Sequence, residues 1–212
     1  MYTNTTRTHL SKDAKKKLLR LTSSTLVRLW WEQTSRNDVS RVLYIGDSIS
    51  CATRSIATSC SDGKLLFDGF GTSKALDNPF LFDSIRMFAK QQKYRDVVLF
   101  NNGLHGWHLD EAQYLCYYEK AVKFLLDEFK DTSIVIVLTT SVSNAEREQR
   151  VKSRNEIAVK IAAKYGLPII DLYSISAEFA ELRTDDGVHF NADGYRKFAE
   201  QIISDLKNIN RK

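Results

Sequence analysis

The chain has 212 residues, a formal net charge of +5 and a pI of about 9.0. Apolar residues make up 43% of it, enough for a buried core, while only 2 prolines and 9 glycines argue against long disordered or low-complexity segments. The sequence contains no run of about 18 apolar residues, so we expect no membrane-spanning helix.

The N-terminal segment is strongly basic, above all at residues 12–20, "KDAKKKLLR". We interpret this run as a solvated helix face; an arm that meets nucleic acid is the alternative, but no RNA-binding or helix-turn-helix signature accompanies it. The first residues lack an apolar signal-peptide core, so we expect a cytoplasmic protein.

Apolar residues at three- and four-residue steps predict a helix over residues 11–33. We expect Trp30 and Trp31 to pack at the domain edge, with a membrane-surface helix as the alternative. The chain is thereby divided into an N-terminal helical extension, residues 1–40, packed on a domain of residues 41–212.

Strands and helices then alternate along the chain. The predicted strands cover residues 41–46, 64–71, 96–102, 133–141 and 168–173. A helix is expected after the first strand, and others over residues 78–93, 109–129, 146–166 and 191–209, with Asn78 as the N-cap of the second. Continuous apolar strands separated by helices indicate an α/β fold with a parallel sheet covered on both faces.

The three cysteines, Cys51, Cys60 and Cys116, are odd in number and irregularly spaced. They form neither a disulfide framework nor a zinc pattern, and we interpret them as reduced thiols.

In parallel sheets ligands bind beyond the carboxyl ends of the strands. That rule selects residues 46–48, 71–74, 101–107 and 139–141. Ser48 follows the first strand directly and precedes a helix, so its hydroxyl is a candidate nucleophile, although Gly-Asp-Ser is also an ordinary turn sequence. A hydroxyl needs a base within hydrogen-bond reach to act in this way.

Of the four histidines, His189 is the best candidate for that base. It lies in "DDGVHFNADGY", three residues after Asp186, and in a loop this spacing lets the carboxylate orient the imidazole. The alternative is a solvated loop followed by a helix cap. His9 lies in the polar N-terminal segment. For His105 and His108 the alternatives to a role in this site are packing or half of a metal site, and no third ligand is spaced to complete the latter. We expect no metal and no organic cofactor.

An ester-cleaving site also needs donors for the developing oxyanion. The Ser48 N–H is one candidate, the turn "GTSK" at residues 71–74 offers a second, and "NNGLHG" at residues 101–106 offers side-chain amides and the His105 imidazole.

Together these motifs resemble the SGNH (GDSL-type) hydrolase superfamily. The first block of that family is matched by "IGDSIS" and the last by "DGVH", followed by "FNADGY", and the resemblance covers roughly residues 41–206. It implies a three-layer α/β/α sandwich, flavodoxin-like, around a five-stranded parallel sheet. It also implies a catalytic triad of Ser48, Asp186 and His189.

Two blocks depart from the family pattern. His105 stands where the oxyanion asparagine is expected, and a shifted register would use Asn102 instead. The second block places Lys74, or Ser73, where a glycine N–H is usual. The stretches "TSKALDNP" and "FNNGLHGW" resemble a bacterial subgroup.

The resemblance implies a lipase/acylhydrolase-like serine esterase that acts on small acyl esters, acetyl or short-chain, including esters on carbohydrates. Asp47, Trp107 and His108 are the expected substrate-binding residues; for Trp107, core packing is the alternative. The partner we expect is a small-molecule ester, without nucleic acid or membrane insertion, and the chain is expected to be a monomer or a homodimer. The alternatives are a catalytically degenerate protein that binds an acylated or carbohydrate ligand, and an acyltransferase.

Overall fold

A mixed β-sheet lies at the centre of the computed structural model, which describes residues 27–92 and 94–209. Within these residues six strands lie side by side in the order β1-β3-β2-β4-β5-β6. All neighbours are parallel except β1 and β3. The strands are β1 (Val27–Trp30), β2 (Ser40–Gly46), β3 (Leu65–Thr72), β4 (Val97–Phe100), β5 (Ser133–Val137) and β6 (Ile169–Ile170).

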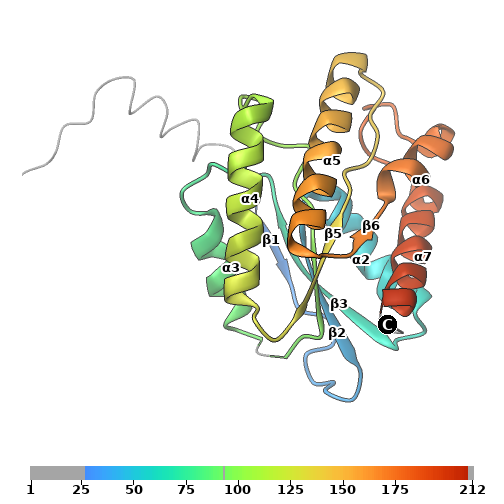
Figure 1. The fold of residues 1–212 in the computed structure, drawn as a ribbon. Helices are drawn as coiled ribbons and strands as arrows, with labels where there is room; N and C mark the ends of the chain where they lie inside the picture. The colour runs from blue at the N-terminus through green and yellow to red at the C-terminus, as the bar shows by residue number, and fades with distance from the viewer. Residues whose placement is uncertain (1–26, 93, 210–212) are drawn as a thin grey trace, which may run out of the picture.

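Helices cover both faces of the sheet (Figure 1). One face packs against α3 (Leu81–Ala89), α4 (Glu111–Glu128) and most of α5 (Ala145–Tyr165); the other packs against α2 (Ser48–Cys60) and α7 (Ala192–Ile209). The short helix α6 (Leu172–Glu178) and a 3-10 turn (Ala180–Leu182) lead into the last loop. The predicted α/β/α class is therefore confirmed.

Side chains of β2 show how the two layers form. Leu43 and Ile45 join the core under α3 and α4, whereas Val42 and Tyr44 join the core under α2 and α7. All four are at most 2% exposed. A strand buried on both faces needs apolar residues at every position, and this is why the sequence runs on without polar alternation.

The helix predicted over residues 11–33 is wrong at residues 27–30, which form strand β1. The backbone of this segment pairs with β3, from Val27 opposite Thr72 to Trp30 opposite Gly69. The sheet therefore has six strands where five were expected, and one of them is antiparallel. Residues 1–26, with the basic run, lie outside the described residues.

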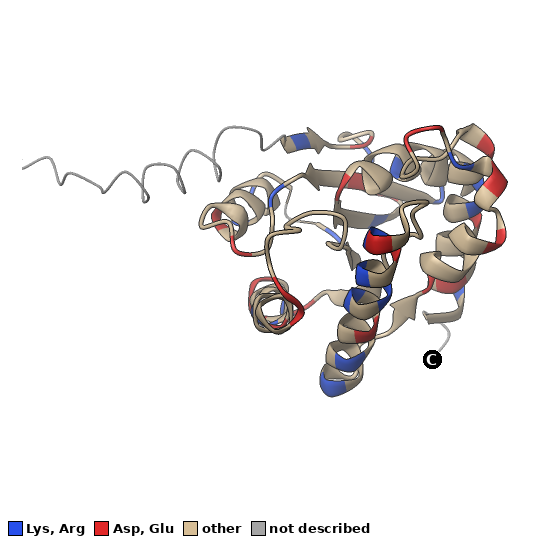
Figure 2. Ribbon diagram, turned by 90° about the horizontal axis from the view of Figure 1, so that it is seen from above, with Lys and Arg blue, Asp and Glu red and all other residues tan. Residues whose placement is uncertain are grey.

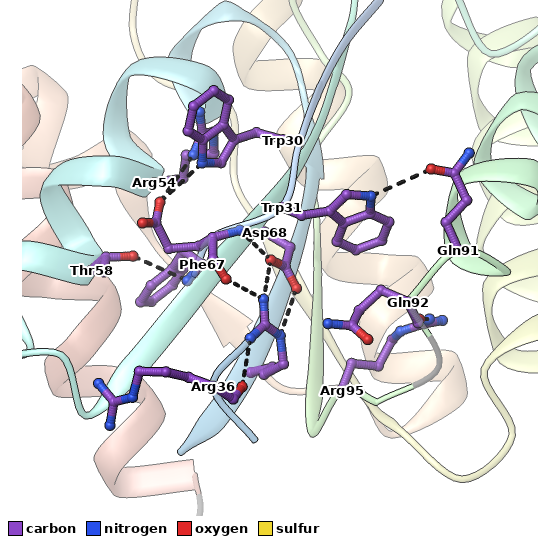
Figure 3. Close-up of polar contacts among 12 residues, drawn as sticks. Trp30, Trp31, Arg36, Arg54, Thr58, Phe67, Asp68, Gln91, Gln92 and Arg95 are labelled. Atoms are coloured by element: carbon purple, nitrogen blue, oxygen red, sulfur yellow. Dashed lines mark hydrogen bonds and ion pairs between the residues drawn. The ribbon is translucent and has the colours of Figure 1, made fainter. Parts of the chain in front are cut away.

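A buried ion pair fixes the segment that follows β1 (Figure 3). The Arg41 guanidinium contacts both oxygens of Asp68, at 2.7 and 3.1 Å. It also donates to the Glu32 carbonyl at 2.5 Å, while the Glu32 N–H donates to Asp68 at 2.8 Å. Trp31 stacks on Phe88 with ring centroids 3.9 Å apart, so it packs inward as expected. Trp30, in contrast, is 53% exposed.

Two element ends also differ from expectation. Helix α3 begins at Leu81 because Asn78 forms a turn, accepting the N–H of Phe80 on its side chain and that of Leu81 on its carbonyl. The last strand stops at Ile170 because the Asp171 side chain accepts the Ser174 N–H and begins α6, which was not predicted.

Lys and Arg residues occur together with Asp and Glu residues along the helices of the described structure, as the ribbon colours in Figure 2 show. None of the helices in residues 27–92 and 94–209 has the length and apolar character that crossing a bilayer requires.

Candidate active site

Ser48 is the first residue of α2 and follows β2 after one residue, Asp47. Its side chain is exposed, whereas the residues on both sides are buried. Asp47 caps the helix, accepting the Ile49 N–H at 2.9 Å. The Ser48 hydroxyl therefore lies at the carboxyl edge of the sheet, beside N–H groups at a helix N-terminus that have no partner within the helix.

The structure brings Ser48, His189 and Asp186 into one hydrogen-bonded chain. The Ser48 Oγ lies 2.8 Å from His189 Nε2, and His189 Nδ1 lies 2.5 Å from Asp186 Oδ2. In this arrangement Nδ1 carries the proton toward the carboxylate, and Nε2 is left to accept the serine proton. The side chains come from opposite ends of the domain, as the sequence motifs indicate.

Asp186 is held by a tight turn. Its Oδ1 accepts the N–H groups of Val188 and His189, each at 2.9 Å. Gly187 completes the turn with φ of 74°, where a Cβ would lie 2.0 Å from Ser143 Oγ. The hydrogen bond from His189, followed by those from the backbone, lowers the pKa of Asp186 well below its ordinary range. The carboxylate is thus ionised and stabilises a positive charge on the imidazole.

A cavity of about 440 Å³ opens beside the serine. Its walls come from β1, the end of β3, the first turns of α2, the loop after β4 and the last loop with α7. The lining residues are Arg28, Asp47, Ser48, Cys51, Ala52, Gly71, Thr72, Ser73, His105, His189 and Tyr195.

Of the expected oxyanion donors, Ser48, Ser73 and His105 line this cavity. Asn102 does not, because its side-chain amide donates to the Lys74 carbonyl at 3.1 Å. The Lys74 N–H donates to Thr72 Oγ1 at 3.0 Å, and Lys74 is also absent from the lining. Of the alternatives left open by the sequence, Ser73 and His105 therefore line the cavity, whereas Asn102 and Lys74 do not.

Two of the three expected substrate-binding residues, Trp107 and His108, lie outside the cavity lining. The Trp107 ring packs against the Arg154 guanidinium, 4.5 Å from its centroid, and His108 pairs with Asp77 at 2.9 Å. Neither residue lines the cavity. Asp47 does line it, but only 1% of its surface is exposed and its carboxylate caps α2. Asp47 therefore stabilises the start of α2, where Ser48 lies.

Arg154, in α5, holds the loop that carries His105. Its guanidinium donates to the carbonyls of Gly103 and His105, both at 2.8 Å, and of Gly106 at 2.9 Å. The loop turns at Gly106, with φ of 71°. Sequence reasoning missed Arg154 because it lies in the middle of a helix, some fifty positions from the loop and outside any motif.

Burial sets the charge states around His105. It lowers the pKa of His105, an effect that the Asp47 carboxylate opposes, and it raises the pKa of Asp47. A neutral imidazole donates one hydrogen bond, and an oxyanion site requires a hydrogen-bond donor.

Several lining residues were also missed by the sequence reasoning. Cys51 and Ala52 follow Ser48 by three and four positions, so in a helix that begins at Ser48 they lie on the same side as the serine. This spacing could have identified them as lining residues. Arg28 was assigned to a helix and therefore not considered. Across residues 27–92 and 94–209, no group of three or more His, Cys, Asp or Glu side chains is placed to hold a metal ion.

No protein-family model and no curated protein matches the chain. Solved structures do match. A lipase/acylhydrolase from Enterococcus faecalis has a TM-score of 0.63 and 16% identity, over 80% of this chain and 96% of that one. An acetyl xylan esterase has a TM-score of 0.61 and 18% identity, over 78% and 99%.

The catalytic domain of a peptidoglycan O-acetyltransferase from Streptococcus pneumoniae has a TM-score of 0.64 and 18% identity, over 82% of this chain and 96% of that domain. At such identities the likeness concerns the fold. The hydrogen bonds that link Ser48, His189 and Asp186 lie at the carboxyl edge of the sheet. The likeness confirms the resemblance in fold: this protein has the fold of the SGNH (GDSL-type) hydrolases.

Proposed function

We propose that the protein is a serine esterase that hydrolyses small acyl esters, with Ser48 as nucleophile. The observation that carries the proposal is the pair of contacts at His189, 2.8 Å to the serine oxygen and 2.5 Å to the Asp186 carboxylate. A serine hydroxyl, an imidazole and a carboxylate in this order form the arrangement that activates a hydroxyl at neutral pH.

In the acylation step, Ser48 Oγ attacks the ester carbonyl while His189 Nε2 takes the hydroxyl proton. Asp186 holds the imidazole in the required tautomer and stabilises the imidazolium. His189 then gives the proton to the departing alkoxide, which leaves as the alcohol. Water repeats the sequence on the acyl-serine and releases the acid.

The tetrahedral oxyanion is stabilised by donors at the cavity wall. These are the Ser48 N–H, the Ser73 segment at the end of β3 and the His105 imidazole, all of which line the cavity. The loss of one such donor typically costs about 3 kcal/mol of transition-state stabilisation.

The size of the site favours acetyl or short acyl groups. A cavity of about 440 Å³ holds a small ester rather than a long lipid chain. One matching structure is named an acetyl xylan esterase and another a carbohydrate esterase, which supports acetylated carbohydrates as the first substrates to examine.

The test is the hydrolysis of p-nitrophenyl acetate and butyrate at mildly alkaline pH by the wild type, Ser48→Ala and Ser55→Ala. Ser55 is an exposed serine on the same helix that does not line the cavity, so its variant is the matched control. We expect turnover to be lost only in Ser48→Ala. Equal, low rates in all three proteins would refute the esterase and favour a degenerate protein that binds an acylated or carbohydrate ligand.

Acyl transfer is a second candidate, favoured by the likeness to an O-acetyltransferase domain. It uses the same acyl-serine but delivers the acyl group to an alcohol instead of water. Adding glycerol to the acetate assay distinguishes the two: a transferase forms glycerol acetate in preference to acetate, and an esterase does not.

A further inference from the structure

The cavity beside Ser48 has an arginine in its wall. Arg28 belongs to β1, where it stands opposite Gly71 of β3, and it lines the same cavity as Ser48, His105 and His189. Its side chain is exposed to solvent. A guanidinium in this place is available to a molecule that enters the cavity.

The neighbouring contacts hold β1 in position. Glu32, just beyond the strand, is tied through its backbone to Arg41 and Asp68, and Trp31 is stacked on Phe88. Trp30 lies against the Arg54 guanidinium, 5.1 Å from its ring centroid (Figure 3). Arg28 is therefore carried by a fixed strand rather than by a free end of the chain.

The nearby acidic groups are engaged elsewhere. Asp68 is paired with Arg41 at 2.7 Å, and Glu32 contacts Arg54 at 3.8 Å. Among residues 27–92 and 94–209, Arg28 forms no ion pair. Its charge does act on the cavity, because it counters in part the effect of burial, which raises the pKa of the Cys51 thiol.

The carboxylates of the site are not paired with Arg28. Asp186 keeps its negative charge but is bound by His189 and by two backbone N–H groups, and Asp47 is 1% exposed. The N-terminus of α2 lies at the cavity and adds a partial positive charge. Arg28 is therefore a positively charged group in the cavity wall with which an entering anion can pair.

We propose that the ester substrate carries an anionic group, a carboxylate or a phosphate, and that Arg28 binds it while Ser48 attacks the ester. Arginine forms paired hydrogen bonds to either group, so the residue determines specificity without taking part in bond breaking. This inference rests on the proposed esterase function and names its substrate class.

The experiment compares two esters of similar size and shape, the anionic 4-acetoxybenzoate and the neutral 4-acetoxybenzamide, with each rate divided by that of uncatalysed hydrolysis. We expect the wild type to prefer the benzoate in kcat/KM. Arg28→Gln should lower the ratio of kcat/KM for the benzoate to that for the benzamide by about tenfold, as for a charge-assisted hydrogen bond. Arg28→Lys should retain part of the preference. The melting temperature of each variant shows that it is folded.

Arg196→Gln is the matched control, since it removes one exposed arginine that lines a different cavity. A second pair, the 4-nitrophenyl monoester of adipic acid and its methyl ester, places the anion on the acyl side. The inference is overturned if the wild type prefers neither anion, or if the preference survives in Arg28→Gln or is lost equally in Arg196→Gln.

Failure of the esterase itself would be recognised separately, as absence of turnover on all four esters. Calorimetric binding of 4-acetoxybenzoate then decides the inference. Weaker binding to Arg28→Gln than to the wild type supports the anion site, and equal binding or none to either protein overturns it.

Discussion

The guanidinium of Arg154 donates a hydrogen bond to the backbone carbonyl of His105 at 2.8 Å. The same side chain binds the carbonyls of Gly103 and Gly106, and its plane packs between the rings of Trp107 and Tyr114, 4.5 and 4.4 Å from their centroids. One buried side chain from α5 thus fixes the loop that places His105, the proposed oxyanion donor, at the cavity.

Arg154 is therefore expected to be a positioning residue. Arg154→Lys should lower kcat for p-nitrophenyl acetate by more than it changes KM, because the displaced imidazole is needed in the transition state rather than in substrate binding. In a His105→Ala background the same substitution should have a much smaller effect on kcat. A purely structural role would give the same loss in both backgrounds, alongside a lower melting temperature.

His105→Ala should lower kcat by about 10²- to 10³-fold with little change in KM, as for the removal of one oxyanion donor. His105→Asn should restore part of the activity, since an amide N–H also donates. Asn102→Ala is the comparison, because Asn102 is buried and binds the Lys74 carbonyl. Steady-state kinetics that show a larger kcat loss in Asn102→Ala than in His105→Ala would reverse the assignment.

Asp186→Asn should reduce kcat by about 10³- to 10⁴-fold, because the amide no longer stabilises the imidazolium. Steady-state kinetics with p-nitrophenyl acetate measure this loss.

Asp186 also makes the stability of the folded protein depend on pH. The pKa of Asp186 is lowered from its ordinary 3.8 in the folded state, so its stabilising effect is present above that value and is lost as pH falls below it. Melting temperatures between pH 4.5 and pH 2 should fall more steeply for the wild type than for Asp186→Asn. Parallel curves would contradict this reasoning.

Asp68→Ala should destabilise the protein by about 3–5 kcal/mol, because it leaves the Arg41 guanidinium buried without its counter-ion. The two side chains are 1% and 0% exposed. Denaturant unfolding of Asp68→Ala and of Arg41→Met/Asp68→Leu provides the test. The double variant should regain much of the loss, and equal destabilisation in both would show that the pair itself is strongly stabilising.

Sequence patterns predicted most of the sheet because β2, β4 and β5 are buried on both faces and read as continuous apolar runs. The residues that approach one another at the site could also be predicted. Ser48 follows the end of a strand, and His189 was selected among the four histidines because Asp186 stands three residues before it. Strand β1 could not be predicted. Its four residues pair at an edge, and their apolar spacing is compatible with a helix until the pairing with β3 is known.

The sequence alone could not show whether His105 or Asn102 lines the cavity, because this depends on tertiary contacts. Both lie in the same loop, and only the contacts of the Asn102 amide and of Arg154 determine which of the two faces the cavity. Such contacts join positions that are far apart in the chain, and no local pattern records them.

Strand β1 also sets a limit on how the protein can be shortened. A fragment that starts at Arg41 would retain Ser48, Asp186 and His189 but lose the strand that carries Arg28 and covers β3. The uncovered strand, eight residues long with a mostly buried sequence, would expose unpaired backbone groups and favour association between fragments. The smallest useful expression fragment must therefore begin at Val27 or before it, because β1 both shields β3 from self-association and contributes Arg28 to the cavity beside Ser48.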